Sequence, residues 1–313
     1  MPKIAIIGAN GFIGRHLVTR LAAVPDNDIV AFDRFSGQDE GGLHPFAAYQ
    51  NITVVRGDFF DKGSLEEAIA GAEYVFHLIS TTTPATANDN PFIDIETNVR
   101  GSLTLFDFCV KHHVKKVIFI SSGGAVYGGI DSDKASEDTP PEPRSPYGIG
   151  KLTIEHFLRY FKYTSGLDYV AYRVGNPYGP GQNIYGKQGV IPIFMRHFLE
   201  QEPITVYGDG SMTRDYIYID DLIDMLAGSY AAANAQAEYN VGSGQGASVN
   251  QLIELIGACA GHQAKKEFLP TPATFIQNSV LAIDRFTNEF NIRPTTSLTD
   301  GIAKTWDYVK DLK

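Results

Sequence analysis

Cysteine is scarce in this sequence, with only Cys109 and Cys259 among 313 residues. Neither lies beside a histidine or a second cysteine, so neither a disulfide framework nor a cysteine-based metal site is expected. Both fall within apolar helical patterns, where free thiols are commonly buried in proteins of a reducing compartment. We therefore expect a cytoplasmic protein without disulfide bonds.

Runs of lysine and arginine are also missing, as are long apolar stretches. The formal net charge of −10 would repel a phosphate backbone, which makes nucleic acid an unsuitable partner. No run of 18 apolar residues occurs, and the chain opens on a strand pattern at residues 3–7 without a signal sequence. We expect neither nucleic acid nor a membrane as a partner.

Short β-branched runs alternate with longer helical patterns in the first half of the chain. Strands are predicted at 3–7, 29–32, 52–56, 74–78, 116–120 and 169–173, and helices at about 13–23, 64–70, 95–113 and 147–164. This alternation is typical of βαβ units, whose parallel strands are apolar because helices cover both faces. The sequence therefore predicts an α/β fold with a doubly wound parallel sheet of the Rossmann type.

The composition of the chain changes after Arg173, where proline and glycine cluster at 176–181. We expect a first domain over residues 1–174 and a smaller C-terminal α/β substrate lobe over 175–313. Whether a late strand and helix return to the first domain stays open. Within the lobe the pattern predicts a strand at 205–207 and helices at 190–200, 221–234, 249–260 and 298–312.

A glycine-rich turn, Gly8-Ala-Asn-Gly11-Phe-Ile-Gly14, joins the first strand to the first helix. Glycines let the backbone approach a pyrophosphate, and the helix N-terminus supplies unpaired N–H donors. Asp33, at the end of the second strand, would accept hydrogen bonds from ribose hydroxyls and repel a 2′-phosphate. That favours NAD over NADP, although the neighbouring Arg34 weakens the preference. The junction predicts an NAD site.

A phenol and an ammonium group stand four residues apart in Tyr147-Gly-Ile-Gly-Lys151, on one face of a predicted helix. A nearby cation favours the phenolate and lowers the pKa of a tyrosine, which makes its oxygen a competent base. The spacing alone is common in helices. The pair follows the fifth predicted strand and the segment 121–128 in the chain, and this position favours a catalytic role for Tyr147 and Lys151.

Together these motifs resemble the extended short-chain dehydrogenase/reductase family, and within it the NAD-dependent nucleotide-sugar epimerases and dehydratases of the UDP-glucose 4-epimerase type. The resemblance spans nearly the whole chain. It includes the glycine turn and Asp33, and then Gly57-Asp58, His77-Leu-Ile, Asn98-Val-Arg-Gly101, Ser121-Ser122, Val126-Tyr-Gly128, the Tyr147 to Lys151 pair, the segment 173–181, Tyr207-Gly-Asp-Gly210, the segment 214–221 and Tyr239-Asn-Val-Gly242.

The resemblance implies a role for each matching residue. Tyr147 would be the catalytic base, assisted by Lys151 and Ser122. Substrate contacts are implied for Ser122, Asn176, Val190, Tyr207 and Arg214. Cofactor contacts are implied for Gly8, Asn10, Gly11, Phe12, Ile13, Gly14, Asp33, Arg34, Asp58, Phe59, Leu78, Ile79, Ser80, Asn98, Ser121, Tyr147, Lys151 and Val174. No metal is expected; His77 lacks a second ligand at metal spacing, and a satisfied buried imidazole is anticipated.

The resemblance also narrows the reaction. The family's dehydratases and decarboxylases carry a Thr or Ser and an acidic residue just before Val-Tyr-Gly, where this chain reads Gly123-Gly-Ala125. Dehydration is therefore disfavoured, and a 4-epimerase is expected, in which Tyr147 takes the C4 hydroxyl proton while NAD takes and returns the hydride. A 4-ketosugar reductase and an NAD-binding sensor that has lost catalysis stay open.

Two departures from the family pattern affect the substrate side. The epimerase serine usually stands where this chain has Gly123, so either Ser122 replaces that hydroxyl or the site lacks it. The segment 270–277 lacks an arginine that commonly binds the diphosphate in this family. Arg214 would therefore have to supply more of the positive charge that binds the diphosphate. A surface salt bridge from Arg214 to Asp215 or Asp220 is the structural alternative. The nucleotide stays open between UDP, dTDP and GDP.

Two predicted helices, 95–113 and 147–164, carry more apolar residues than contact with one sheet requires. In proteins that this chain resembles, the corresponding helices pair across a two-fold axis into a four-helix bundle, which implies a homodimer. The alternative is that these side chains only pack on the sheet. They are Leu103, Phe106, Phe108, Ile154, Phe157, Leu158 and Phe161.

Overall fold

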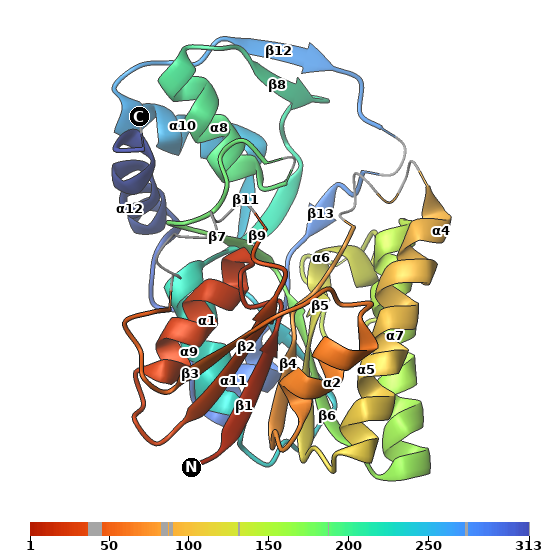
Figure 1. The fold of residues 1–313 in the computed structure, drawn as a ribbon. Coiled ribbons are helices and arrows are strands. Elements are labelled where there is room, and N and C mark those ends of the chain that lie inside the picture. The colour runs from red at the N-terminus through yellow and green to blue at the C-terminus, as the bar shows by residue number, and fades with distance from the viewer. Residues whose placement is uncertain are drawn as a thin grey trace.

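The apolar runs of the first half form the centre of a seven-stranded sheet (Figure 1). The computed structural model describes residues 1–36, 46–82, 87, 90–130, 132–186, 188–272 and 275–312. The strand order is β10-β6-β5-β4-β1-β2-β3, and all six neighbouring pairs are parallel. The strands are β1 (Lys3–Ile7), β2 (Asp28–Asp33), β3 (Ile52–Arg56), β4 (Tyr74–His77), β5 (Lys116–Ser122), β6 (Asp168–Val174) and β10 (Glu238–Val241).

Helices cover both faces of this sheet, which confirms the predicted doubly wound α/β fold. On one face lie α2 (Lys62–Ile69), α5 (Arg100–Lys111) and α7 (Pro146–Ser165), and on the other α1 (Phe12–Ala22), α9 (Ile219–Ser229) and α11 (Asp284–Phe290). The strand order reverses between β1 and β4. In sheets of this kind ligands bind beyond the carboxyl ends of the strands at such a reversal.

The predicted helix 95–113 is not one α-helix. It starts earlier as α4 (Pro91–Asp94), where the Asn90 side chain accepts the Phe92 N–H, and continues through a π-helical turn, η1 (Ile95–Val99), into α5. Within this segment the Asn98 Nδ2 donates to the Asp94 Oδ1 at 2.7 Å. Since π turns occur mainly at functional sites, this interruption marks a segment of interest. A further short helix, α6 (Gly123–Val126), follows β5.

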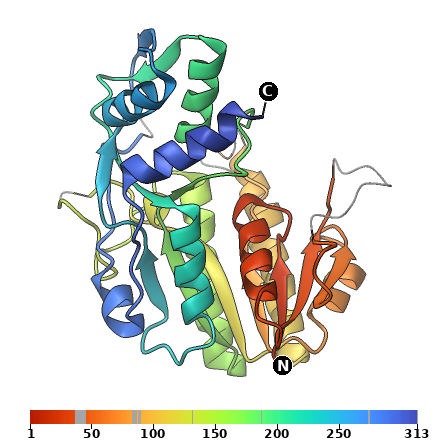
Figure 2. The same cartoon turned by 90° about the vertical axis from the view of Figure 1, so that its left-hand side faces the viewer.

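Beyond the carboxyl ends of the strands lies a second lobe, in which Figure 2 shows the C-terminus far from the N-terminus. Its helices are α8 (Val190–Glu200), α10 (Val249–Ala260) and α12 (Leu298–Lys310), and strand β8 (Ile204–Tyr207) pairs with β12 (Lys266–Leu269). A small sheet of β7 (Asn176–Tyr178), β9 (Thr213–Tyr218), β11 (Gly246–Ser248) and β13 (Asn278–Ser279) lies between the lobe and the large sheet.

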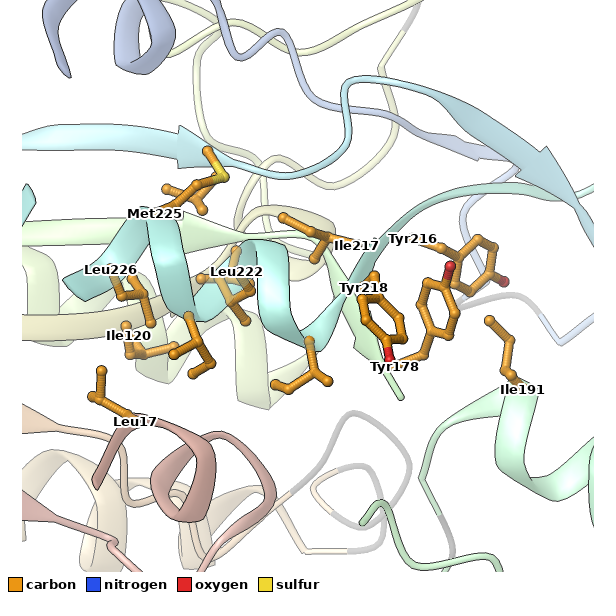
Figure 3. Close-up of a cluster of buried hydrophobic side chains, with 14 of the residues drawn as sticks. Leu17, Ile120, Tyr178, Ile191, Tyr216, Ile217, Tyr218, Leu222, Met225 and Leu226 are labelled. Atoms are coloured by element: carbon orange, nitrogen blue, oxygen red, sulfur yellow. The ribbon is translucent and has the colours of Figure 1, made fainter. Parts of the chain in front are cut away.

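One apolar core joins the two parts. Figure 3 shows Leu222 of α9 near Leu17 of α1 and Ile120 of β5, with a series of tyrosines leading on to Ile191 of α8. Strand β10, which follows α9 in the chain, pairs with β6 in the large sheet. Residues after 174 therefore belong to both the sheet and the lobe. No helix in the described ranges is long and apolar enough to cross a bilayer.

Candidate active site

The glycine turn after β1 has the shape that a dinucleotide requires. Gly8 adopts φ +102°, a conformation that L side chains rarely adopt. A Cβ on Gly14 would lie 2.1 Å from the Gly8 carbonyl oxygen, so the helix can approach the strand only with glycine there. Gly11 caps helix α1 without a side-chain hydrogen bond, which leaves the first N–H groups available to an anion. The turn fits the pyrophosphate of NAD.

An open depression of about 640 Å³ lies beside this turn. The sequence predicted most of its lining, but Gly57, Phe60 and Thr81 were missed as contacts. Gly57 could have been recognised, since it precedes the predicted contact Asp58 in the Gly57-Asp58 motif. The complete lining is Gly8, Gly11, Asp33, Arg34, Gly57, Asp58, Phe59, Phe60, Leu78, Ile79, Ser80 and Thr81.

Asp33, the last residue of β2, lines the depression. Its Oδ2 accepts the Asn10 N–H at 2.9 Å and its Oδ1 accepts the Arg34 N–H at 2.7 Å. These bonds tie the glycine turn to the end of β2 and fix the direction of the carboxylate. Asp58 is exposed beside it, and its Oδ1 accepts the Phe60 N–H at 2.9 Å. Both carboxylates keep free lone pairs for hydroxyl or amine donors.

Several predicted cofactor residues do not line the depression. Phe12 and Ile13 begin helix α1 and are half-buried, and Val174 is buried in the core. The Asn98 Oδ1 accepts the Thr81 N–H at 2.8 Å, which holds the strand-end loop in place. Ser121 donates its hydroxyl to Glu155 at 2.5 Å, so its side chain serves the buried framework.

Tyr147 stands in the first turn of α7, which the Ser145 side chain caps by accepting the Gly148 N–H. The residue is half-buried, and its hydroxyl is hydrogen-bonded to Ser122. Burial, together with the nearby Asp94, raises the pKa of Tyr147 to about 12, and the Ser122 bond opposes this. Desolvation thus prevails at Tyr147, and a lowering of this pKa by Lys151 stays a prediction.

Lys151 lies one turn further along α7 and is buried. Its Nζ donates to the Ile120 carbonyl at 2.9 Å and lies 4.8 Å from the centre of the Phe119 ring and 5.7 Å from that of Tyr147. Burial lowers the pKa of Lys151 to about 8, against the opposing influence of Asp94 and Glu155. The ammonium group is thus anchored to β5 beside the phenol.

A buried polar network that sequence reasoning missed supports the pair from behind. Glu155, one turn after Lys151, forms a two-pronged ion pair with Arg173 of β6, with 2.7 Å between Nη2 and Oε2. Arg173 also donates to the Tyr127 hydroxyl, which donates to Asn240 of β10. Paired buried charges of this kind hold a helix in one position on its sheet.

Gly123 explains why the family's usual hydroxyl is absent. A Cβ at this position would lie 2.6 Å from Cδ1 of Leu281 and 3.1 Å from the Arg173 carbonyl oxygen. A serine there would not fit without displacing Leu281. Ser122, one residue earlier, supplies the hydroxyl that meets Tyr147 instead.

The other predicted substrate residues lie in the four-stranded small sheet and in the second lobe. The Asn176 Nδ2 donates to the Asp215 carbonyl at 3.0 Å, and Val190 begins helix α8. Tyr207 is 36% exposed and packs edge-on against Phe275, with 5.2 Å between ring centres. Phe275 belongs to the segment 270–277 that lacks the clamp arginine; residues 273 and 274 of that segment lie outside the described residues.

Arg214 is half-buried, and its Nη1 donates to the Thr213 carbonyl at 2.8 Å. Burial lowers the pKa of Arg214, and no carboxylate of the described chain lies within ion-pair distance. Asp215, one of two suggested partners, is fully buried and accepts hydrogen bonds from Ser243 and Gly244. The remaining guanidinium donors of Arg214 therefore suit an anion.

His77 is buried, and its Nε2 lies 2.7 Å from the Ser102 hydroxyl. Its Nδ1 has no partner in the described part of the chain, so the expected satisfied imidazole is found at only one of the two ring nitrogens. Burial and the positive charge of Lys151 lower the pKa of His77 to about 3, which keeps the ring neutral. Among the described residues no group of three His, Cys, Asp or Glu side chains could hold a metal.

Known proteins resemble the chain over its full length. The profile of the NAD dependent epimerase/dehydratase family matches residues 4–242. A UDP-glucose 4-epimerase from Mycolicibacterium smegmatis is 33% identical and covers 99% of each chain. A dTDP-4-dehydro-6-deoxyglucose reductase from Escherichia coli is also 33% identical and covers 96% of this chain and 95% of its own.

The same likeness is seen in three dimensions. The structure of a UDP-glucose 4-epimerase from Thermotoga maritima with UDP-glucose matches with a TM-score of 0.91 at 32% identity, over 99% of each chain. Together with the family profile, this match confirms the resemblance noted in the sequence. The chain therefore belongs to the NAD-dependent epimerase/dehydratase family within the extended short-chain dehydrogenases/reductases, and its cofactor is NAD.

Proposed function

We propose that this protein is a nucleotide-sugar 4-epimerase in which Tyr147 is the base. The observation that carries the proposal is the arrangement of Tyr147, with its hydroxyl bonded to Ser122 and the Lys151 ammonium one helical turn away. A hydroxyl donor and a cation beside one phenol stabilise the phenolate, which is the form that accepts a proton from a sugar hydroxyl.

Separate residues of the site would bind NAD and move the substrate proton. The glycine turn and Asp33 would hold the pyrophosphate and ribose of NAD. Bound NAD supplies the hydride acceptor, and its positively charged ring favours the phenolate. Tyr147 would take the proton from the C4 hydroxyl. It would return the proton after the 4-keto sugar has rotated in the site to present its other face. Ser122 would steer that proton transfer, while Lys151 holds its position through the Ile120 carbonyl.

Arg214 supports a diphosphate as the handle of the substrate. A half-buried guanidinium with no carboxylate among the described residues has donors to offer, and its planar fork matches phosphate oxygens. The Tyr207 and Phe275 rings offer an apolar surface on which a base could stack. These groups support a nucleotide diphosphate without choosing between UDP, dTDP and GDP.

The test is an assay of the purified enzyme with NAD on a panel of UDP-, dTDP- and GDP-hexoses, with products separated by chromatography. The expected result is interconversion of at least one pair of 4-epimers without net reduction of NAD. The variant Tyr147→Phe should bind NAD and lose this conversion. Conversion of no pair by the parent enzyme would overturn the proposal.

A 4-ketosugar reductase is the second candidate, because the Escherichia coli reductase is as similar in sequence as the mycobacterial epimerase. The same Tyr147 would then donate a proton to a keto oxygen instead of removing one. Net consumption of reduced nicotinamide, followed by its absorbance with a 4-ketosugar, would favour this candidate. A hydride that is returned within each turnover leaves that absorbance unchanged.

We also propose a homodimer through α5 and α7. Four of the seven apolar side chains expected at this interface, Phe106, Ile154, Leu158 and Phe161, instead pack on the sheet. Leu103, Phe108 and Phe157 are half-buried. The proposal rests more on large exposed apolar side chains along the same helices and the turn before α5, which are Phe92, Ile95, Ile149, Tyr160 and Tyr163.

A cytoplasmic location is proposed on the state of the two cysteines. Cys109 is buried and Cys259 is half-buried, and both are free thiols. Free thiols are typical of a reducing compartment. Detection of the protein in the soluble cytoplasmic fraction of its source cells is the corresponding test.

A further inference from the structure

A carboxylate that neither the sequence motifs nor the proposed mechanism uses lies beside the catalytic pair. Asp94 ends helix α4 and is only 2% exposed. Its Oδ1 accepts the Thr82 hydroxyl at 2.5 Å and the Asn98 amide at 2.7 Å. Its Oδ2 is buried and has no hydrogen-bond partner among the described residues. A buried oxygen without a partner is costly and needs an explanation.

Helix α7 is shaped to accept this carboxylate. A Cβ on Gly150 would lie 1.6 Å from the Asp94 Oδ2 and 2.8 Å from its Cγ. Asp94 can therefore lie where it does only because residue 150 has no side chain. Gly150 stands between Tyr147 and Lys151 in the helix, so the carboxylate faces the backbone that joins the phenol to the ammonium.

The charge of Asp94 acts on both members of the pair. It raises the pKa of Lys151 and so counters the effect of burial on that ammonium group. It also raises the pKa of Tyr147, in the same direction as burial does.

We propose that Asp94 is a positioning residue that supplies the counter-charge of Lys151 and controls the ionisation of Tyr147. Thr82 and Asn98 hold the carboxylate by donating hydrogen bonds to its Oδ1. The consequence for catalysis rests on the proposed epimerase function. The electrostatic link between Asp94 and Lys151 does not depend on it.

Other ionisable groups around Lys151 cannot replace this counter-charge. Glu155, on the same helix, is held by Arg173 of β6 in the ion pair described above. His77 of β4 is neutral because its pKa is lowered to about 3. From β5, the Ile120 carbonyl contributes a hydrogen bond but no charge. Within the described residues, Asp94 is the remaining anion that acts on both Lys151 and Tyr147.

The direct test follows Lys151 by NMR in protein with ¹³C-labelled lysine, using the Lys151→Arg variant to assign its signal. In the parent protein the signal should titrate near pH 8. In Asp94→Asn the midpoint should fall by about one pH unit or more, because an anion that favours the charged ammonium group has been removed. No substrate is needed, so the result is independent of the epimerase assay.

Glu96→Gln is the matched control, since it removes one negative charge from the same helical segment at an exposed position. It should leave the Lys151 midpoint unchanged. Asp94→Leu serves as a second variant that removes the charge without placing an unbonded amide in the core. A midpoint that stays at its parent value in the folded Asp94 variants, or that falls equally in Glu96→Gln, would overturn the proposal.

The pH profile of kcat/KM extends the test to catalysis. Loss of a negative charge lowers the pKa of both Tyr147 and Lys151, so Asp94→Asn should move the acidic and the basic limbs of the profile to lower pH together. A purely structural role would reduce the rate at every pH and leave both limbs in place, which contradicts the proposal. An absence of any epimerase activity would count against the proposed function, whereas the NMR result judges Asp94 separately.

Discussion

Gly123 and Leu281 compete for the same space, because a Cβ on residue 123 would lie 2.6 Å from Cδ1 of Leu281 and 2.7 Å from its Cδ2. Leu281 is 1% exposed and packs with Tyr127 and Ala135, so it has little room to move. Position 123, where the family usually carries a hydroxyl, must therefore remain glycine to leave room for Leu281. Ser122 is left to make the hydrogen bond to Tyr147.

Gly123→Ser should destabilise the protein by about 1–3 kcal/mol without adding activity, because the new side chain overpacks a filled site. Denaturant unfolding followed by circular dichroism measures this. Gly124→Ser is the matched control, since a Cβ there would meet the Ser279 hydroxyl at an ordinary 3.5 Å. Equal stability of the two variants would contradict the packing explanation.

Ser122→Ala should lower kcat/KM by roughly 10- to 100-fold, the worth of one hydrogen bond to a charged group. The Ser122 bond lowers the pKa of Tyr147, so its loss raises that pKa further. The acidic limb of the pH profile should therefore move to higher pH, opposite to the shift expected for Asp94→Asn. Steady-state rates between pH 6 and 10 would test the sign, and a limb that stays in place would exclude Ser122 from the proton transfer.

Ser121→Ala provides the contrast to this variant. The Ser121 hydroxyl donates to Glu155 inside the buried network, away from Tyr147. Its removal should cost about 1–2 kcal/mol of unfolding free energy, because a buried acceptor loses its donor. The pH profile of the folded enzyme should keep the parent's limbs.

Arg214→Ala should raise the KM for the nucleotide sugar by roughly 10- to 100-fold while NAD affinity stays unchanged, because one charge-assisted contact to phosphate is lost. Kinetics and calorimetric titration with NAD separate the two effects. Arg20→Ala is a suitable control, since its exposed pair with Asp224 lies on the surface and contributes little. An unchanged KM in Arg214→Ala would place the diphosphate elsewhere.

Tyr160→Glu should convert the proposed dimer into a monomer. Tyr160 is 56% exposed on α7, and a carboxylate there would be buried unpaired in a helix–helix interface. Sedimentation velocity of the parent and the variant gives the two masses. Tyr308→Glu, which alters an exposed tyrosine on α12, should leave the mass of the parent assembly unchanged. A monomeric parent protein would rule out the dimer.

Much of the first half of the fold followed from local pattern. Strands β1 and β3 begin and end where the apolar runs predict, as do helices α8 and α10 in the lobe. The glycine turn was recognisable because steric demands on its backbone fall on residues three apart in the chain. The pairing of Tyr147 with Lys151 was likewise readable, since helical geometry alone brings residues four apart together.

Contacts between segments far apart in the chain were harder to predict from the sequence. Strand β10 follows a loop-rich region and yet completes the large sheet by pairing with β6. No periodicity in the sequence predicts this pairing. The raised pKa of Tyr147 was missed because desolvation depends on what packs around the ring. Nothing in the local sequence marks the role of Gly150, because the Asp94 carboxylate that lies against it belongs to a different helix, α4.

The sequence by itself determined the fold class, the glycine turn proposed to hold NAD and the proposed catalytic pair, because each depends on spacing within one strand–turn–helix unit or one helical turn. Only the tertiary structure decided which hydroxyl meets Tyr147 and which anion lies beside Lys151. Those outcomes depend on side chains that are far apart in the chain and compete for the same few ångströms, as Leu281 and Asp94 do at Gly123 and Gly150.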